Sequence, residues 1–244
     1  MIGKSNWERL LKNPDWYIRI VPELEMIKKE AASRLQFERE NLAEEIYSFF
    51  EEKLNNREIA LGNEIGNWDK ERKPIDTIVI HHTEMNPGVT KDRLSAITLV
   101  RLYAPYYAKP YDKREINIIG KPISSGHLRD GKQVFWPYHW IVRMNGKIEQ
   151  LLHENETGWH AGDWDTNCRS IAIVLDNNYV NSRPDEKVLK AATNLIHSKY
   201  NYIPKDRIFG HREVRLLGPT SCPSNLFLSK DNYKGWKEEL LELI

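Results

Sequence analysis

Short apolar runs separated by turn residues dominate the chain after residue 75, and they constrain its fold more than any other feature. Residues 75–80 and 170–175 are short runs rich in Ile and Val, which favour buried strands. The stretches 138–144 and 147–152 flank Asn145-Gly146, a pair that suits the type I′ turn of a β-hairpin. Helices are expected over 94–103 and 185–200, and mostly loop over 105–134. Strands interspersed with helices predict an α/β (α+β) domain with a central mixed β-sheet flanked by helices.

Residues 1–70 have a different pattern and are predicted to form an N-terminal helical appendage. Pro22 suits the first position of a helix, and apolar residues recur at helical spacing to about residue 54. The simplest interpretation is a helix that packs one apolar stripe on the main domain, with oligomerisation through this helix as a second hypothesis. We therefore divide the chain into a helical region of unknown role, 1–70, and a main domain, 71–244.

Charge and hydropathy exclude several classes of partner. The 36 basic and 35 acidic side chains leave a net charge of +1, so the overall charge provides no general attraction for nucleic acid or anionic lipid. No apolar run approaches the roughly 20 residues of a membrane helix, and the N-terminus lacks the apolar core of a Sec signal. We expect a protein that is cytoplasmic where it is made; release by lysis and export by another route are both compatible with the sequence.

A scattered set of metal-ligand residues points to chemistry. His81 and His82 close the first apolar run, while His211 and Cys222 lie far downstream, separated by a loop with Gly218 and Pro219. Two imidazoles and a thiolate can hold one Zn²⁺ and leave its fourth position open, which is the arrangement of a catalytic zinc site. Side chains alternate along a strand, so only one of the two adjacent histidines should bind the metal.

Other residues compete for a place at this site. A disulfide between Cys168 and Cys222 is the alternative to metal binding, although free thiols are favoured without a signal peptide. Tyr138 and His139 should face opposite ways on one strand, and the Tyr138 phenol could stabilise an oxyanion or simply pack in the core. His160 lies in a loop of small residues and is expected to contact substrate or to hold the loop in place.

Several short motifs, taken in order, carry a family resemblance. They are Ile78-Val79-Ile80-His81-His82-Thr83, Tyr138-His139-Trp140, Gly158-Trp159-His160-Ala161-Gly162, Arg169-Ser170-Ile171-Ala172-Ile173, Gly210-His211-Arg212-Glu213 and Thr220-Ser221-Cys222-Pro223. Together they resemble type 2 N-acetylmuramoyl-L-alanine amidases, the superfamily that includes the peptidoglycan recognition proteins and the phage lysozyme-type amidases. The resemblance covers about residues 75–228 and leaves the N-terminal region outside.

The resemblance implies a zinc amidase that cleaves the amide between the lactyl group of N-acetylmuramic acid and L-alanine of the peptidoglycan stem peptide. It chooses His81 over His82 as a metal ligand, with His211 and Cys222. It assigns catalytic roles to Tyr138 and Thr220, and we expect substrate contacts from His160, His82 and Trp159.

Some positions depart from the family pattern. The loop from His211 to Cys222 is longer than is usual in recognition proteins, through Arg215-Leu216-Leu217, and Val174 stands where some cytosolic recycling members have a catalytic Glu. Recognition proteins that lack the Cys ligand bind peptidoglycan without cutting it. A non-catalytic peptidoglycan- or muropeptide-binding module is therefore the alternative function, and a zinc hydrolase with another amide substrate is a third.

Overall fold

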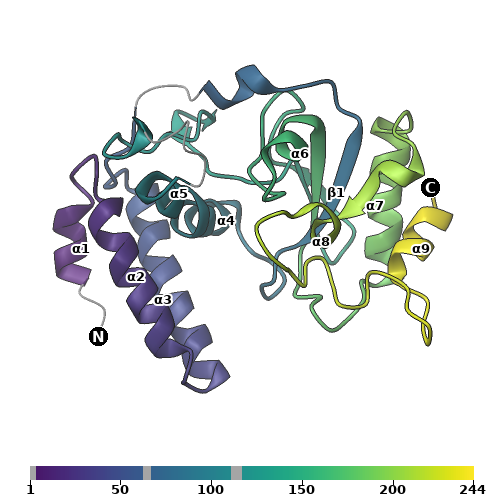
Figure 1. Cartoon of the computed structure of the whole chain (residues 1–244), viewed down its shortest axis with the longest axis horizontal. Coiled ribbons are helices and arrows are strands. Elements are labelled where there is room, and N and C mark those ends of the chain that lie inside the picture. The colour runs from purple at the N-terminus through teal and green to yellow at the C-terminus, as the bar shows by residue number, and fades with distance from the viewer. Residues whose placement is uncertain (1–3, 63–66, 111–116) are drawn as a thin grey trace. The chain divides into compact units, whose positions relative to one another are not determined.

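A computed structural model describes residues 4–62, 67–110 and 117–244, and it divides the chain into two compact units (Figure 1). The first unit takes its described residues from 1–67 and 91–135, and the second comprises 68–90 and 136–244. The units differ from the sequence-based division at residue 70, because the segment 91–135 belongs to the unit of the N-terminal helices.

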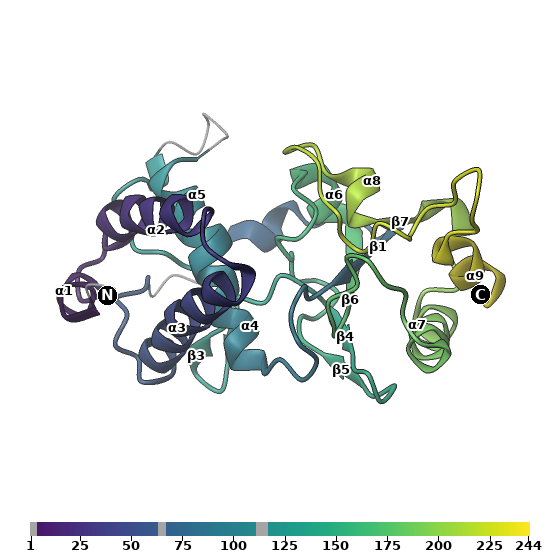
Figure 2. The same cartoon turned by 90° about the horizontal axis from the view of Figure 1, so that it is seen from below.

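The second unit is built on a five-stranded mixed sheet with the strand order β5-β4-β6-β1-β7 (Figure 2). Its strands are β1 (Thr77–His82), β4 (Trp140–Val142), β5 (Ile148–Gln150), β6 (Ser170–Leu175) and β7 (Ile208–Gly210). Strands β6 and β7 both run parallel to β1, β4 runs parallel to β6, and β5 is antiparallel to β4. The predicted mixed sheet, and the strands expected near 75–80 and over 170–175, are confirmed.

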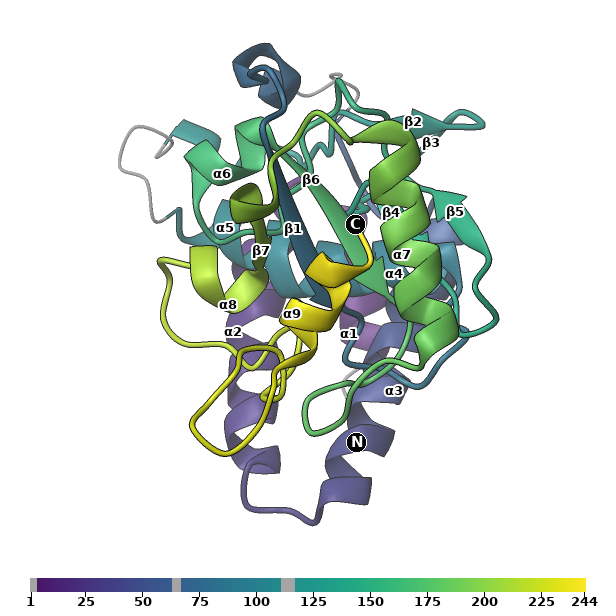
Figure 3. The same cartoon turned by 90° about the vertical axis from the view of Figure 1, so that its right-hand side faces the viewer.

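Helices α7 (Glu186–Lys199) and α9 (Trp236–Glu242) cover one face of this sheet (Figure 3). Alternate side chains of β1 and β6, among them Ile80 and Ile173, form a single buried cluster with residues of α7 and α9. The helix predicted over 185–200 is confirmed. The intervening residues of β1 and β6 therefore face the opposite side of the sheet.

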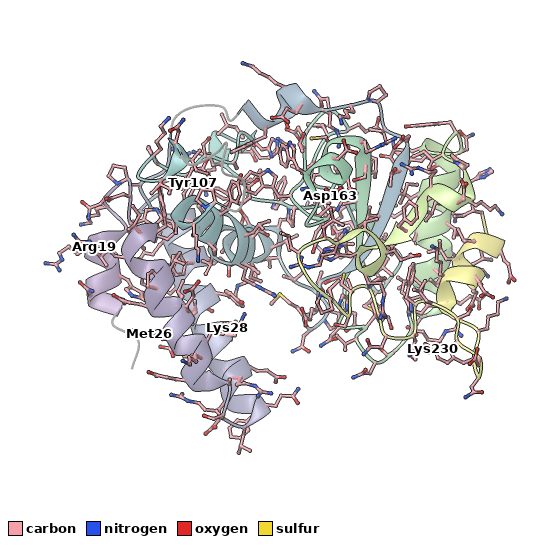
Figure 4. The ribbon with its side chains drawn as sticks, in the orientation of Figure 1. Arg19, Met26, Lys28, Tyr107, Asp163 and Lys230 are labelled. Atoms are coloured by element: carbon pink, nitrogen blue, oxygen red, sulfur yellow. The ribbon has the colours of Figure 1, made fainter. Side chains whose placement is uncertain are left out.

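The remaining helices of the second unit are short. They are η1 (Asn67–Glu71), α6 (Trp164–Arg169), η4 (Lys205–Arg207) and α8 (His211–Val214). Helix α6 begins at a side-chain cap, because the Asp163 carboxylate accepts a hydrogen bond of 2.9 Å from the backbone N–H of Thr166 (Figure 4). Helix α8 follows directly on β7, so its first residue, His211, is placed at the end of a sheet strand.

The β4–β5 hairpin forms as predicted, but its turn is of another type. The backbone N–H of Gly146 donates to the Arg143 carbonyl, and that of Arg143 donates to the Lys147 carbonyl. Gly146 has φ 79°, whereas Asn145 is not among the residues with positive φ. A type I′ turn needs positive φ at both central residues, so the prediction was wrong; the contacts describe a type I turn followed by a left-handed glycine.

The first unit is mainly helical. It contains α1 (Lys4–Leu10), α2 (Tyr17–Ala31), α3 (Gln36–Asn55), α4 (Lys91–Thr98), the π-helical η2 (Leu99–Tyr103), α5 (Ala104–Ala108) and the two-residue strands β2 (Leu128–Arg129) and β3 (Lys132–Gln133). The helix predicted over 94–103 is thus longer at both ends. Trp7, Trp16 and Phe50 form the buried aromatic core of the first unit. The segment 91–135 is tied to the N-terminal helices by polar contacts, such as that of Arg93 with Glu44.

The single long helix predicted from Pro22 is wrong, because the structure has two helices joined by residues 32–35. Pro22 lies inside α2, where its ring removes one backbone donor but buried neighbours such as Ile20 still hold the helix in place. Arg19, Met26 and Lys28 lie on the exposed side of α2 (Figure 4). Oligomerisation through this region stays a prediction. Across the described residues, no helix is both long and apolar enough to span a membrane.

Candidate metal centre

The two adjacent histidines of β1 point to opposite faces of the sheet. His82 lies on the face of α7 and α9, and its Nδ1 accepts a hydrogen bond of 2.8 Å from the backbone N–H of Tyr179. His81 lies on the opposite face and is fully buried. Of the two, it is His81 that groups with His211 and Cys222. The choice of His81 as the metal ligand stays a prediction.

His81, His211 and Cys222 converge on one point. One nitrogen of each histidine and the Cys222 Sγ all lie within 4.8 Å of one another. The distance from Cys222 Sγ to His81 Nδ1 is 3.6 Å. Two ligands at zinc–sulfur and zinc–nitrogen lengths of about 2.3 and 2.05 Å, held at a tetrahedral angle, would be about 3.6 Å apart. The distance between Cys222 Sγ and His81 Nδ1 therefore fits a shared zinc ion.

The second histidine presents a free nitrogen to the same point. The ring of His211 hydrogen-bonds the backbone carbonyl of Ala161. Its Nε2 is buried and has no hydrogen-bond partner in the part of the chain that the structure describes. A buried acceptor without a partner is costly, and a metal-binding histidine commonly donates its other N–H to a carbonyl. His211 therefore has the tautomer and the orientation of a ligand.

A chain of hydrogen bonds orients His81 in the same way. The Ser170 hydroxyl lies 2.5 Å from the backbone carbonyl of Thr166, to which it can only donate. Ser170 Oγ then accepts from His160 Nε2 at 3.1 Å, which leaves His160 Nδ1 as the acceptor for His81 Nε2–H at 3.0 Å. The remaining nitrogen of His81, Nδ1, carries its lone pair toward Cys222. A backbone carbonyl thus sets the tautomer of a ligand through two intervening side chains.

Burial keeps the ligand histidines neutral in the metal-free protein. It lowers the pKa of His81 well below its usual range and, assisted by the positive charge of Arg215, lowers the pKa of His211 to about 4. Burial also raises the pKa of Cys222 to about 12, although a hydrogen bond from the His82 backbone N–H opposes that effect. A metal that binds the Cys222 thiolate would therefore displace one proton.

Tyr138 and Thr220 lie beside the ligands. The ring centroid of Tyr138 is 4.9 Å from that of His81, and the Tyr138 side chain is partly exposed. Thr220 Oγ1 accepts a hydrogen bond of 3.2 Å from the backbone N–H of Cys222. The structure thus brings both residues predicted to be catalytic to the edge of the ligand cluster.

The other predicted site residues have mainly internal contacts. Trp159 is buried and packs edge-on against Trp68, with ring centroids 4.8 Å apart. His139 is buried, its Nδ1 accepts from the Ala172 backbone N–H at 3.0 Å, and its Nε2 lies 2.9 Å from the Glu156 carbonyl. His139 is therefore a hydrogen-bonded core residue, which agrees with the expectation that its side chain and that of Tyr138 face opposite ways.

Two further predictions concern the cysteines and position 174. Cys168 and Cys222 are both free thiols, so the disulfide alternative does not form. The parallel register sets Val174 directly beside His81, on the same face of the sheet. An apolar side chain therefore occupies the register position opposite His81, and no carboxylate base comes from there.

Sequence reasoning missed three residues of the site. Ser170 sets the tautomer chain, Ala161 orients His211, and Arg215 lies close enough to influence the pKa of both His211 and Cys222. Ser170 and Ala161 were parts of recognised motifs, but the partner of Ala161 is 50 residues away, and those of Ser170 are brought to it by the turn of α6. Nothing in the local pattern showed what they contact.

Comparison with known proteins identifies the family. The model described as Amidase_2, N-acetylmuramoyl-L-alanine amidase, matches residues 71–225. The chain belongs to this amidase family. His81, Tyr138, His211 and Cys222 all lie within the matched range. Membership places this amidase among the hydrolases that act on cell-wall peptidoglycan.

Individual relatives are more distant. The amidase is 26% identical over 162 residues to the 1,6-anhydro-N-acetylmuramyl-L-alanine amidase AmpD of Haemophilus influenzae, covering 60% of this chain and 76% of AmpD. The solved endolysin amidase LysCS of Clostridium intestinale is 23% identical, with a TM-score of 0.42 and coverage of 64% and 78%. The Drosophila peptidoglycan recognition protein SD is 20% identical, with a TM-score of 0.38 and coverage of 62% and 76%.

Proposed function

We propose that this chain is a zinc-dependent N-acetylmuramoyl-L-alanine amidase. It hydrolyses the amide between the lactyl group of N-acetylmuramic acid and L-alanine of the stem peptide. The observation that carries the proposal is the convergence of His81 Nδ1, His211 Nε2 and Cys222 Sγ, because the second nitrogen of each histidine is already hydrogen-bonded. A set of two nitrogens and one thiolate leaves room for water, as catalytic zinc sites do.

The residues around the ligands supply the rest of the mechanism. When bound, Zn²⁺ lowers the pKa of a coordinated water and polarises a carbonyl. The Tyr138 phenol, whose ring lies beside His81, donates a hydrogen bond to the oxygen on which negative charge develops. The Thr220 hydroxyl accepts from the Cys222 backbone N–H and keeps its own proton for the substrate. Position 174, beside His81, holds a valine, so the mechanism does not use a carboxylate base from that position.

Trp159, His160 and His82, from which substrate contacts were predicted, are proposed to act mainly through other residues of the site. Both ring nitrogens of His160 are engaged, with His81 and Ser170, so His160 contributes to substrate binding chiefly by holding His81. His82 contributes through its backbone N–H to Cys222, because its ring is used by Tyr179 on the other face. Trp159 forms part of an aromatic wall with Trp68.

One experiment tests the function directly. The purified protein is analysed for zinc, and digests of intact sacculi and of small soluble muropeptides are examined by mass spectrometry, with and without prior chelation. Stoichiometric zinc and new L-alanine amino termini that disappear on chelation support the amidase. Tight muropeptide binding without products would instead support the non-catalytic binding module, and products cut at another amide would overturn the assigned bond.

The same digest addresses the biology. A lytic enzyme released from the cell should prefer intact sacculi, whereas a recycling enzyme that stays in the cytoplasm should prefer small muropeptides. We propose that the protein is cytoplasmic where it is made, and fractionation of cells that express it would check this.

A further inference from the structure

The loop between His211 and Cys222 carries an arginine that the proposed mechanism does not use. The backbone N–H of Arg215 donates to the His211 carbonyl at 3.1 Å, so Arg215 closes the helical turn that begins with a metal ligand. Leu216 and Leu217, which follow it, are 77% and 47% exposed. The loop therefore sets a cation and two apolar side chains at the border of the metal centre.

The Arg215 side chain lies across the loop that contains His160. A Cβ atom built on Gly162 would be 3.1 Å from both Cγ and Nη1 of Arg215, so the glycine leaves the space that the arginine occupies. Gly162 comes two residues after His160 and directly after Ala161, the partner of His211. Arg215 is therefore held against the segment that orients both ligand histidines.

Arg215 is held in place without a counter-ion. Its Nε is buried and has no hydrogen-bond partner, and no ion pair joins its guanidinium to a carboxylate, within the described residues. Other partly buried arginines of this unit have acceptors within the protein: Arg143 pairs with Glu149 and Asp176, whereas Arg72 and Arg212 donate to backbone carbonyls. A guanidinium without a carboxylate partner in the protein can pair with an anionic ligand, since guanidinium binds carboxylates through two parallel hydrogen bonds.

The charge of Arg215 also reaches the metal ligands. It lowers the pKa of His211 and that of Cys222, although burial is the larger effect on each. A positive charge that acts on both residues lies close to the point where they converge. A carboxylate a few bonds from the scissile amide would come within its range.

We propose that Arg215 binds a carboxylate of the stem peptide, namely the free α-carboxylate of the D-glutamate that follows L-alanine. This inference rests on the proposed amidase function. It makes Arg215 a residue that determines specificity, favouring stem peptides whose second residue carries the free acid over those in which that group is amidated. The neutral amide cannot form the charge-assisted pair with the guanidinium.

The test uses two ligands that differ at one functional group: N-acetylmuramoyl-L-alanyl-D-isoglutamate and the corresponding D-isoglutamine. Binding to the metal-free and the zinc-loaded protein is measured by calorimetry, and turnover by mass spectrometry. The natural enzyme should prefer the acid. In Arg215→Met the preference should fall roughly 10- to 100-fold, toward unity, with the amide ligand nearly unaffected, because hydrogen bonds to charged groups have this strength. Arg215→Lys should retain part of the preference.

Leu216→Ala serves as the matched control, since it alters the exposed neighbour in the same loop and should leave the preference unchanged. Equal loss of binding for both ligands in Arg215→Met would show a merely structural role and overturn the proposal. Equal binding of acid and amide by the natural protein would also overturn it. Preferential binding of the acid without any cleavage would support the role of Arg215 and overturn the amidase function instead.

Discussion

Both faces of the central sheet are buried, but one is packed with apolar side chains and the other contains hydrogen-bonded polar ones. On one face, Ile78, Ile80 and Ile173 pack with α7 and α9 in an apolar cluster that needs no polar partner. On the other face, His81 and Ser170 are equally buried, yet each is held by a directional hydrogen bond. Burial alone therefore does not separate structural from functional residues; what distinguishes His81 is a ring nitrogen that faces Cys222.

The comparison is sharpest within β1, where His81 and His82 are adjacent. His82 uses its ring to hold the backbone of Tyr179 and so acts as part of the core, whereas His81 directs one nitrogen to Cys222. One residue of displacement along a strand thus separates a structural histidine from a candidate metal ligand.

The largest effect is expected at the thiolate ligand. Cys222→Ala removes one of three donors, so the protein should lose both stoichiometric zinc and detectable amidase activity. Metal analysis and the muropeptide digest measure the two losses. Cys168→Ala is the matched control, because Cys168 is equally buried but does not belong to the ligand cluster. An active, zinc-replete Cys222→Ala protein would rule out the ligand assignment.

A substitution on the apolar face should act on stability alone. Ile173→Ala removes a fully buried side chain from the α7 cluster and should cost about 2–5 kcal/mol of unfolding free energy. Zinc stoichiometry and turnover per folded molecule should stay unchanged. Urea denaturation followed by metal analysis checks this, and a loss of zinc at low urea would show that the two faces are not independent.

Tyr138→Phe should separate chemistry from metal binding. It deletes the phenol hydroxyl beside His81, so turnover should fall by about 10²–10³ while zinc is retained. Tyr179→Phe, on the opposite face, is the control and should cut substrate at the natural rate. Unaltered turnover in Tyr138→Phe would remove the phenol from the mechanism.

Ser170→Ala tests the hydrogen-bond chain behind His81. Without the hydroxyl, His160 loses the group that fixes its tautomer, so zinc affinity should fall about 10- to 100-fold. Competition with a zinc-binding dye measures the change. Ser198→Ala, whose hydroxyl only bonds the Leu195 carbonyl on α7, is the control. Unchanged affinity would mean that packing alone orients His81.

The last prediction concerns the dependence of the unfolding free energy on pH, where the effect per pH unit is small. Burial lowers the pKa of His82 to about 4, below the usual value near 6.5, so between these values the unfolded state binds a proton that the folded state does not. Stability should therefore fall as pH falls through this window, by about 1.4 kcal/mol per pH unit for this histidine, and be unaffected above it. In the metal-free protein, His82→Asn should show a shallower slope in urea denaturation; an equal slope would contradict the assignment.

The sheet was predictable because its signals are local. The runs at 75–80 and 170–175 contain enough β-branched residues to specify buried strands, and strand alternation alone showed that only one of His81 and His82 could face the metal. The motif order then brought His211 and Cys222 to the same site. Each of these inferences needs only neighbours in sequence or a family pattern.

The errors arose where distant contacts decide the structure. The helix predicted from Pro22 starts earlier and ends at Ala31, because buried neighbours offset the missing donor and no strong breaker marks residues 32–35. The placement of 91–135 with the N-terminal helices depends on pairs such as Arg93 and Glu44, 49 residues apart. The same holds for His160 and His81, which are 79 residues apart.

The wide separation of the ligands has a consequence for biosynthesis. Cys222 meets His81 across 141 residues of chain, and β1 lies between two strands that are both made after it. A growing polypeptide on the ribosome therefore carries His81 for most of its synthesis with neither its sheet neighbours nor its fellow ligands. If the proposed function holds, the nascent chain cannot cleave peptidoglycan until almost the whole domain has been synthesised.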